Sequence, residues 1–302
     1  MTSPGLELTR FAPAPTGRLH LGHVANALYV WGLGQRRGAR VVLRIEDHDA
    51  QRSRAEYEGA LLDDLDWLGF TPNYFKTSEF RAGPCLSRQS DRRAIHRSEA
   101  ERLIARGLVY ACTCTRKTAA AAGGRTEAGC AGSCRTRELP LADDVIWRVR
   151  LGSMPAGFDD ELGGPQRAAV PPEDPAIRDR RGNWTYQFAV AVDDHLQGVT
   201  LVIRGRDLLS STTTQIRLAK LCGRLSPARF AHHPLVMKTA TQKLSKSSGD
   251  TGIDELRADG WSAERVIGEA AARVGLLPAG ASLPAGEAAG LFSPPLWPVV
   301  AG

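Results

Sequence analysis

Residues 11–23, FAPAPTGRLHLGH, are the most informative stretch of the chain. The apolar residues just before it predict a short strand that stops at its two prolines, because proline has no N–H to donate to a strand ladder. A glycine then lets the chain turn, and apolar residues recur at helical spacing over residues 21–28. The stretch therefore predicts a strand, a turn and a helix that begins near His20.

Two histidines of this stretch, His20 and His23, lie on one face of the first helical turn. The unpaired N–H groups and the dipole at a helix N-terminus attract phosphate oxygens. Gly22 between them leaves room for a flat ligand to approach the backbone. Taken alone, an HxxH pair is more often a pair of solvated or capping histidines.

The second candidate phosphate site is the polar stretch KTATQKLSKSSGD, residues 238–250, which contains Lys243 and Lys246. Two lysines three residues apart, flanked by hydroxyl side chains, form a basic loop that can close over a triphosphate and neutralise charge as pyrophosphate leaves. On its own such a segment is more often a solvated loop. Its combination with the histidine pair favours a nucleotide site.

The surrounding pattern alternates between strand and helix. The apolar run RVVLRI, residues 40–45, is typical of a buried parallel strand, and leucines at helical spacing over residues 61–68 predict a helix that Gly69 ends. The pattern resumes after Tyr186, with VTLVI, residues 199–203, as its clearest strand. This order predicts an α/β fold with a Rossmann-type, doubly wound parallel sheet.

The composition is that of an ordinary globular protein. Of 302 residues, 42% are hydrophobic and 24% charged, which excludes disorder of the whole chain. The 39 Lys and Arg exceed the 33 Asp and Glu by 6, which permits a polyanionic partner without requiring one. The sequence has neither an 18-residue apolar run nor a signal-peptide pattern, so we expect no membrane association and a cytoplasmic location.

The two motifs together resemble the HIGH and KMSKS signatures of class I aminoacyl-tRNA synthetases. Three further stretches are similar to the glutamyl branch of that family: LRIEDHD (residues 43–49), a Cys-x-Cys pair, and YQFAVAVDDHLQGVTLVIRGRDLL (residues 186–209). The resemblance extends from residue 8 to about residue 250. Two positions depart from the family pattern, Ala14, where serine is usual, and Gln187, where asparagine often follows the tyrosine.

A glutamate substrate carries two carboxylates and one ammonium, so its site needs a guanidinium and an acid. Arg10, Glu46 and Arg204 all follow or end predicted strands, and ligands of open α/β sheets bind beyond the carboxyl ends of strands. The resemblance implies that the two arginines hold the substrate carboxylates, that Glu46 holds the ammonium and that Tyr186 adds a hydroxyl contact. It also places these residues against the substrate: Phe11, Ala12, Pro13 and Ala14.

An alternative interpretation of Glu46 is a structural salt-bridge network along the same stretch, with Arg44, Asp47, Asp49 and Arg52. The acidic pair of Asp193 and Asp194, with His195, either shapes the pocket or fixes a turn. No general base is needed, because the attacking substrate carboxylate is already ionised at neutral pH. Catalysis then consists of positioning and charge neutralisation.

The resemblance assigns the ATP-binding groups. His20, Gly22 and His23 bind ATP, Lys246 and secondarily Lys243 stabilise the leaving pyrophosphate, and Mg²⁺ is bound mainly by ATP itself.

Four of the six cysteines fall within 23 residues: Cys112, Cys114, Cys130 and Cys134. Four thiolates suit a closed, tetrahedral, structural zinc site, and the segment has little apolar periodicity to hold it otherwise. Unrelated free thiols are the alternative. The resemblance supports zinc, since glutamyl-type enzymes often carry it in this insertion. Cys85 and Cys222 are expected to be buried as small hydrophobic residues.

The motifs divide the chain into four parts. Residues 1–110 form the first half of the catalytic domain, 111–185 a zinc-binding insertion, 186–250 the second half with the KLSKS loop, and 251–302 a short helical segment with a Pro/Gly-rich tail. After Lys246 only 56 residues remain, fewer than the roughly 100 of an added anticodon-binding domain.

This length is similar to that of stand-alone paralogues of the glutamyl branch. These activate glutamate with ATP and transfer it to queuosine in the anticodon loop of tRNA(Asp), so the resemblance implies glutamate, ATP and this tRNA as partners of a monomer. The alternatives are a truncated enzyme that charges the 3′ end of tRNA(Glu), a ligase acting on small amines, and an inactive RNA-binding module. Five arginines can contact RNA or lie on a solvated helix face: Arg81, Arg88, Arg92, Arg93 and Arg97.

Overall fold

The computed structural model describes residues 6–115, 130, 132–152, 157–166, 174–237 and 251–292. The KLSKS stretch, with Lys243 and Lys246, lies outside the described residues. The described strands are β1 (Leu8–Phe11), β2 (Arg40–Leu43), β3 (Val109–Cys112), β4 (Ile146–Val149), β5 (Phe158–Asp160), β6 (Gly164–Gln166), β7 (Ala176–Arg178), β8 (Leu201–Gly205) and β9 (Arg229–His233).

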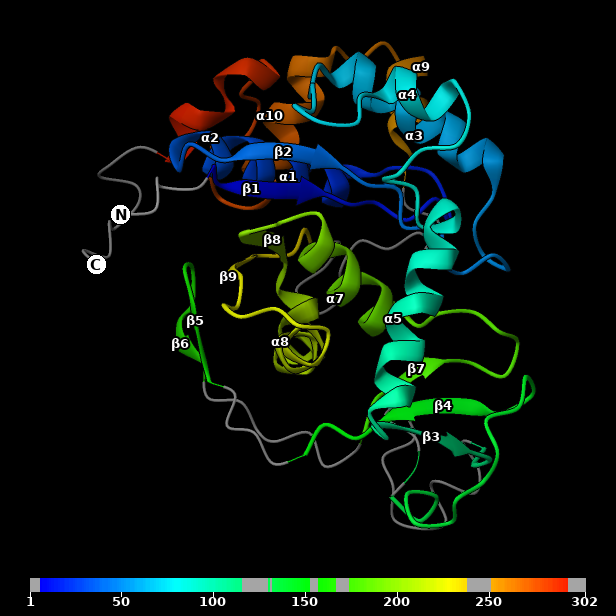
Figure 1. The fold of residues 1–302 in the computed structure, drawn as a ribbon. Helices are drawn as coiled ribbons and strands as arrows, with labels where there is room; N and C mark the ends of the chain where they lie inside the picture. Colours follow the sequence, from blue (N-terminus) through cyan, green and yellow to red (C-terminus); the bar gives the residue numbers. More distant parts are fainter. Residues whose placement is uncertain are drawn as a thin grey trace.

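The helical elements alternate with these strands along the chain and continue after the last of them (Figure 1). The α-helices are α1 (Leu21–Leu28), α2 (Gly34–Arg36), α3 (Ala55–Leu68), α4 (Thr77–Arg81), α5 (Arg93–Ala105), α7 (Tyr186–Leu196), α8 (Thr212–Leu221), α9 (Ile253–Ala258) and α10 (Ala263–Arg273). The other helical segments are a π-helix, η1 (Tyr29–Leu33), and three 3₁₀ segments, η2 (Gln89–Arg92), η3 (Arg206–Ser211) and η5 (Ala285–Phe292).

The strands that flank the predicted motifs are parallel. β1 pairs with β2 over its whole length, and β8 pairs with β9 in the same way. The N–H of Thr200 donates to the carbonyl of Leu8 at 2.9 Å, which links the start of β8 to β1. The strand predicted over residues 40–45 is confirmed but ends at Leu43, after which Ile45 forms an isolated bridge with Arg88.

β8 is covered on both faces, as a doubly wound sheet requires. Leu201 and Ile203 belong to the main apolar core with β1, β2, α1, α3 and α10, whereas Val202 packs in a second cluster with Phe230 and Ile216. Figure 1 shows α3, α9 and α10 beside β1 and β2, with α7 and α8 on the other side of β8. Side chains that point to opposite faces of β8 thus contact two different layers of helices.

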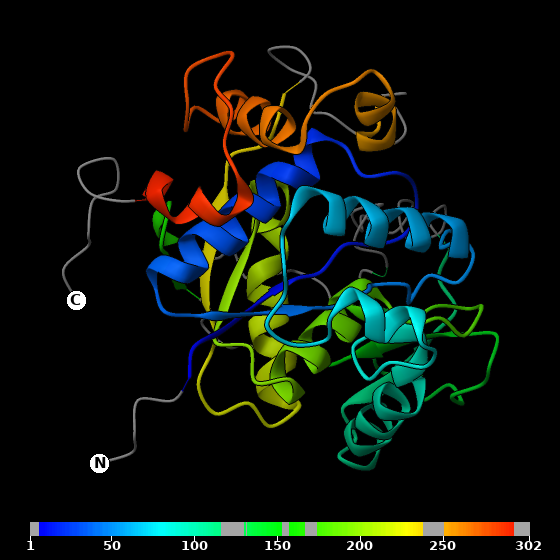
Figure 2. The same cartoon turned by 90° about the horizontal axis from the view of Figure 1, so that it is seen from above.

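The helix after the first strand begins where the sequence predicts. α1 starts at Leu21, and the helical path runs on through η1 and α2 to Arg36. Within η1, Gly32 packs directly against the ring of Phe292 from η5. Figure 2 shows η5, in red, lying against the blue helix that contains this glycine. The predicted helix over residues 61–68 is also confirmed: α3 ends at Gly69, which has a φ of 81°.

The range 111–185, predicted as one insertion, contains two separately placed pieces. β3, β4 and β7 form a small antiparallel sheet at the end of α5 (Figure 1). The hairpin of β5 and β6 instead joins the parallel strands, because β5 pairs with β9. A segment of the predicted insertion is therefore part of the sheet that carries Arg204.

In the described part of the chain, no helix has both the length and the apolarity that a bilayer crossing requires.

The tight packing of α10 gives a test of this fold. An added Cβ at Gly268 would overlap the carbonyl oxygen of Ala281, a backbone atom that cannot move aside cheaply. The substitution Gly268→Ala should therefore lower the free energy of unfolding by about 1–3 kcal/mol in urea denaturation. The control is Gly59→Ala in α3, where nothing lies within 4 Å of the added Cβ and alanine should be neutral or stabilising by up to about 1 kcal/mol. Equal effects of the two substitutions would contradict this packing.

Candidate active site and cysteine cluster

The two histidines of HLGH cap α1 with their own rings. His20 is the N-cap residue, and its Nδ1 accepts the N–H of Gly22 at 3.1 Å. The Nδ1 of His23 accepts the N–H of His20, also at 3.1 Å, and the ring centroids lie 4.1 Å apart. Because both Nδ1 atoms are acceptors, each neutral ring carries its proton on Nε2. The motif therefore builds a helix N-terminus with two imidazole N–H donors.

The structure gives a reason for glycine at position 22 besides the predicted approach of a ligand. A Cβ at this position would lie 2.9 Å from Cε1 and 3.0 Å from Nδ1 of the His20 ring. The ring of His20 folds over the glycine, so the space beside the backbone is filled by the cap itself. Glycine therefore permits the capping geometry, and the approach of a flat ligand to this backbone stays a prediction.

Arg10, at the end of β1, is buried and paired with Asp194 of α7. Its Nε lies 3.2 Å from Oδ1 of Asp194, and its Nη1 donates to the carbonyl of Ile203 at 3.0 Å. Arg44, which follows β2, donates to the same carboxylate oxygen at 2.7 Å and is fully buried. Burial alone would raise the pKa of Asp194, but Arg10 and Arg44 outweigh it and hold that pKa below its usual range.

Glu46 is buried next to this pair. Its Oε1 accepts from Arg44 at 2.9 Å, so the Arg44–Glu46 part of the predicted salt-bridge network is present. Asp47 and Asp49 instead accept backbone N–H groups, from Ser90 at 2.7 Å and Gln51 at 3.1 Å. The network therefore leads from Glu46 through Arg44 to Asp194, away from the other acids of its own stretch.

Asp193 belongs to a separate network, although it neighbours Asp194 in sequence. Its carboxylate accepts from Arg92 at 2.7 Å, from His96 at 2.9 Å and from Gln89 at 2.8 Å. Burial would raise the pKa of Asp193, yet His96, Arg44 and Arg92 keep it well below the ordinary value. Successive residues of a helix point about 100° apart, so the two acids of α7 serve different neighbours.

Arg204, in β8, is 4% exposed and is surrounded by neutral acceptors. Among the described residues its acceptors are the His232 Nε2 at 3.0 Å, the Gln215 amide oxygen at 2.6 Å, the Thr212 hydroxyl at 2.7 Å and the Leu208 carbonyl at 3.4 Å. Burial lowers the pKa of Arg204, while Tyr186 opposes this shift and Arg10 adds to it. A buried guanidinium without a carboxylate in contact is suited to an anionic ligand.

Tyr186, the first residue of α7, lies where these groups converge. Burial raises the pKa of its hydroxyl, and that group also feels the charges of Arg204, Glu46, Arg10 and Asp194, in that order. Its hydroxyl also acts on Arg204, because Tyr186 raises the pKa of that guanidinium against the effect of burial. The structure thus brings together Arg10, Glu46, Tyr186 and Arg204, the four polar residues predicted for the amino-acid pocket.

The segment from Phe11 to Ala14 lies beside this cluster and contributes mainly backbone. The Phe11 ring is in the core against Trp31, with ring centroids 5.2 Å apart, and Pro13 is also buried, whereas Ala12 and Ala14 are half-buried. The carbonyls of Phe11 and Pro13 accept from the N–H groups of Arg44 and Glu46. Gln187, the second departure from the family pattern, donates to the hydroxyl of Ser211 at 2.9 Å.

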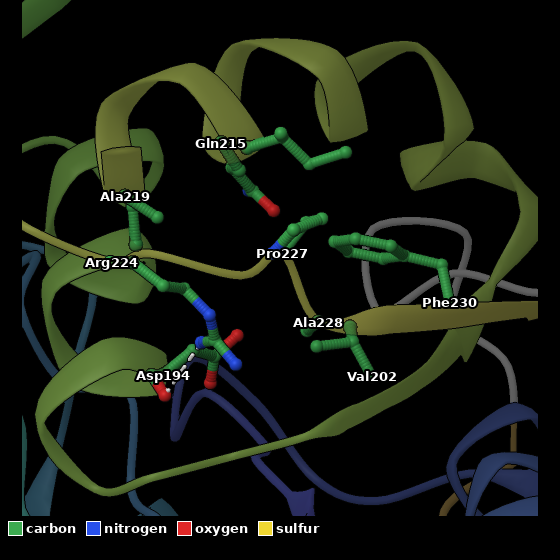
Figure 3. Close-up of a pocket in the computed structure, with 10 residues that line it drawn as sticks. Asp194, Val202, Gln215, Ala219, Arg224, Pro227, Ala228 and Phe230 are labelled. Atoms are coloured by element: carbon green, nitrogen blue, oxygen red, sulfur yellow. Dashed lines mark hydrogen bonds between the residues drawn. The ribbon is translucent and has the colours of Figure 1, made fainter. Parts of the chain in front are cut away.

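A small pocket lies between α7, α8, β8 and β9. Figure 3 shows Asp194 and Arg224 on one side of the pocket, the apolar side chains of Val202 and Phe230 on the opposite side, and Gln215 above them. The Nη1 of Arg224 donates to the backbone carbonyl of Asp194 at 3.1 Å. Asp194 and Gln215, which hold Arg10 and Arg204, thus line this pocket.

The four clustered cysteines meet beside β3. Their sulfur atoms all lie within 4.8 Å of one another, and Cys112, Cys130 and Cys134 are at most 1% exposed. A tetrahedral zinc ion with Zn–S bonds of about 2.3 Å would separate its sulfurs by about 3.8 Å, so the cluster fits a Cys₄ site. Burial would raise the pKa of Cys130, but surrounding donors, led by the Cys134 N–H, lower it to about 6.

The remaining two cysteines behave as expected. Cys85 and Cys222 are buried, with 6% and 4% exposure, and none of the six cysteines forms a disulfide. Burial raises the pKa of both thiols, that of Cys222 to about 12. They act as small hydrophobic side chains.

Three of the five arginines considered for RNA contact are occupied within the protein. Arg81 pairs with Asp63 and Asp66, Arg88 with Glu58 and Asp91, and Arg92 with Asp193. Arg93 and Arg97 are exposed on α5. Their exposure agrees with either predicted role, contact with RNA or a solvated helix face.

The site also contains residues that the sequence did not single out. Asp160 and His232 form a buried pair next to Arg204, and Gln197 bridges Arg44 and Ser87. Among these, only the His–His–Pro sequence at the end of β9 is an unusual local pattern, and histidine at a strand end is a weak signal by itself.

Comparisons with known proteins agree with this geometry. A family model described as "tRNA synthetases class I (E and Q), catalytic domain" matches residues 8–139 and 148–282. A protein of Rhodobacter capsulatus named glutamyl-Q tRNA(Asp) synthetase is 36% identical over 279 residues, covering 84% of this chain and 96% of that protein. One of the same name from Symbiobacterium thermophilum is 39% identical over 284 residues, covering 89% and 86%.

Longer relatives match as well. A glutamate–tRNA ligase of Frankia casuarinae is 37% identical over 254 residues, covering 83% of this chain and 52% of that protein. A crystal structure of a glutamate tRNA ligase from Elizabethkingia meningosepticum, in complex with its amino acid, superposes with a TM-score of 0.71 at 27% identity, covering 88% of this chain and 60% of that one. The chain thus spans about half the length of these ligases.

The fold and the family match define a class I aminoacyl-tRNA synthetase catalytic domain, which confirms the predicted fold class and ligase chemistry. Within that class, the chain belongs to the glutamyl and glutaminyl family.

The shared carboxylate of Asp194 gives a pH-dependent test. Its folded-state pKa lies below the unfolded value of about 3.9, so its stabilising contribution is present above about pH 4 and is lost as the pH falls through the folded-state pKa. Asp194→Asn leaves the buried Arg10 without its carboxylate partner and Arg44 with Glu46 alone, and should cost about 3–5 kcal/mol at pH 7.

We expect the difference between wild type and Asp194→Asn, measured by urea denaturation from pH 7 to pH 3, to shrink at the acidic end. Asp144→Asn, at an exposed position, should change stability by less than about 0.5 kcal/mol and serves as the control. A difference that stays constant over this pH range would refute the assigned ion pairs.

Proposed function

We propose that this protein activates L-glutamate with ATP and transfers the glutamyl group to queuosine in the anticodon loop of tRNA(Asp). The observation that carries the amino-acid assignment is the buried Arg204, whose hydrogen-bond acceptors in the described part of the chain are all neutral. An anion bound there would add a directly bonded negative charge to the more distant charge of Asp194. Arg10 is the second cation for the substrate, and Glu46 is the acid for its ammonium group.

The ATP end of the site consists of the capped helix. In this proposal, the Nε2–H groups of His20 and His23, with the N-terminus of α1, bind the triphosphate, while Lys246 and Lys243 neutralise the departing pyrophosphate. Magnesium arrives bound to ATP. The glutamate carboxylate attacks the α-phosphorus, the bond to the pyrophosphate oxygen breaks, and glutamyl-adenylate remains. No side chain has to take a proton in this step, because the nucleophile is already an anion.

The acceptor assignment rests on the relatives. Matches that extend over 96% and 86% of two proteins named glutamyl-Q tRNA(Asp) synthetase support queuosine as the acceptor. Identity to the glutamate–tRNA ligases is similar, so charging of the 3′ end of tRNA(Glu) is the competing function. Both functions share the same activation chemistry and differ in which RNA receives the glutamyl group.

We also propose that the Cys₄ cluster holds one structural zinc ion. When bound, zinc would fix the loop that carries Cys130 and Cys134 to the end of β3. With four thiolate ligands there is no open position for substrate, so the ion would support folding of this region and take no part in the reaction. The protein is expected to act as a cytoplasmic monomer.

The acceptor can be tested directly. The protein is incubated with ATP and radiolabelled glutamate, using tRNA(Asp) prepared with and without queuosine and tRNA(Glu) as a third substrate. We expect label only on the queuosine-containing tRNA(Asp), and we expect it to resist removal of the 3′-terminal nucleotide. Label on tRNA(Glu) that is lost with that nucleotide would assign the competing function, and absence of glutamate-dependent ATP–pyrophosphate exchange would overturn both.

The zinc proposal has its own readout. Elemental analysis of the purified protein should give one zinc per chain, and Cys130→Ser should lose it, because a hydroxyl replaces a thiolate ligand. Cys85→Ala is the matched control, since that buried thiol lies outside the cluster and should leave the zinc content unchanged. Retention of a full equivalent of zinc by Cys130→Ser would remove this cysteine from the ligand set.

A further inference from the structure

We propose that Asp160 and His232 are positioning residues that orient the Arg204 guanidinium toward the substrate, without touching the substrate themselves. The proposal rests on the proposed function, in which Arg204 binds a substrate carboxylate. Three segments far apart in sequence supply the three groups: the β5–β6 hairpin, β9 and β8.

The first link is between neighbouring strands. Arg204 and His232 are paired residues in the parallel register of β8 and β9, so their side chains leave the sheet on the same face. The Nε of Arg204 lies 3.0 Å from Nε2 of His232. Because an arginine N–H can only donate, this ring nitrogen must be the acceptor and cannot carry a proton.

The second link fixes the histidine. With Nε2 as acceptor, the proton of the neutral ring is on Nδ1, which contacts Oδ2 of Asp160. The side chains of His232 and Asp160 are each 1% exposed, so this pair is shielded from water. Burial lowers the pKa of His232, an effect that the Asp160 contact opposes, and the ring stays neutral near pH 7.

The third link holds the aspartate. Its Oδ1 accepts the N–H groups of Leu162 at 3.0 Å and Gly163 at 2.8 Å, and its Oδ2 accepts the N–H of His232 at 3.1 Å. These bonds lock the carboxylate in the turn between β5 and β6. Burial would raise the pKa of Asp160, but the His232 contacts and these N–H groups keep it low, so it stays an anion.

The chain of bonds has a definite polarity. Asp160 can only accept, so His232 donates from Nδ1 and accepts at Nε2, and Arg204 donates from Nε. The substitution Asp160→Asn would break this sequence of donors and acceptors. The amide oxygen would face the N–H groups of the turn, and the amide NH₂ would face His232. The proton of the His232 ring would then move to Nε2 and point at the Nε–H of Arg204. Because two donors cannot hydrogen-bond with each other, the guanidinium would turn away.

The test compares Asp160→Asn with Asp159→Asn, the exposed neighbour on the same strand. In glutamate-dependent ATP–pyrophosphate exchange, Asp160→Asn should raise KM for glutamate by roughly 10-fold to 100-fold, with KM for ATP changed by less than about twofold. Asp159→Asn should leave both values unchanged. Equal increases in both KM values, or none, would overturn the proposal.

Two further comparisons separate orientation of Arg204 from general structural damage. In an Arg204→Ala background, Asp160→Asn should have no further effect on KM for glutamate, whereas independent structural damage would add to it. His232→Gln keeps an oxygen that can accept from Arg204 and should retain more glutamate affinity than His232→Leu. Additive effects, or equal loss in both His232 variants, would contradict the assigned link.

A spectroscopic readout is independent of any activity. In ¹⁵N-histidine-labelled wild-type protein, the signal that His232→Gln removes should show a protonated Nδ1 and an unprotonated Nε2, the less common neutral tautomer. The opposite tautomer would overturn the proposal even in an active enzyme. Conversely, wild-type protein with this tautomer but without glutamate-dependent exchange would refute the proposed function while leaving the Asp160–His232 geometry intact.

Discussion

The buried carboxylate of Asp194 is the interaction on which the site depends. It joins α7 to Arg10 at the end of β1 and to Arg44 after β2, two guanidiniums that could not be buried without an anion. Glu46 is then held through Arg44. One side chain from the second half of the fold thereby fixes the charged groups at the carboxyl ends of both strands of the first half.

The local features of the chain could be predicted from the sequence. The helix start at His20, the buried parallel strand at Arg40 and the end of α3 at Gly69 each follow from spacing, proline or glycine within about a dozen residues. The candidate pocket residues Arg10, Glu46 and Arg204 followed from the rule that ligands bind beyond strand ends, which needs only the strand positions, whereas Tyr186 came from the family resemblance.

What the sequence could not predict is the pairing of charges across long separations. Asp193 and Asp194 are chemically identical neighbours, and only the orientation of α7 decides that one receives His96 and Arg92 while the other receives Arg10 and Arg44. The β5–β6 hairpin has three-residue strands with little apolar pattern, so its place beside β9 depends on tertiary contacts such as Asp160 with His232.

The two arginines proposed to bind the substrate differ in their electrostatic state, and this difference bears on selectivity. Arg10 already has a carboxylate partner, whereas the acceptors of Arg204 in the described residues are neutral. A substrate with a carboxylate at Arg204 supplies a directly bonded anion, while an isosteric amide leaves this buried cation without one and presents N–H groups to a donor-only side chain. In the proposed site, discrimination between glutamate and glutamine therefore follows from the neutral acceptors that the described residues offer to Arg204.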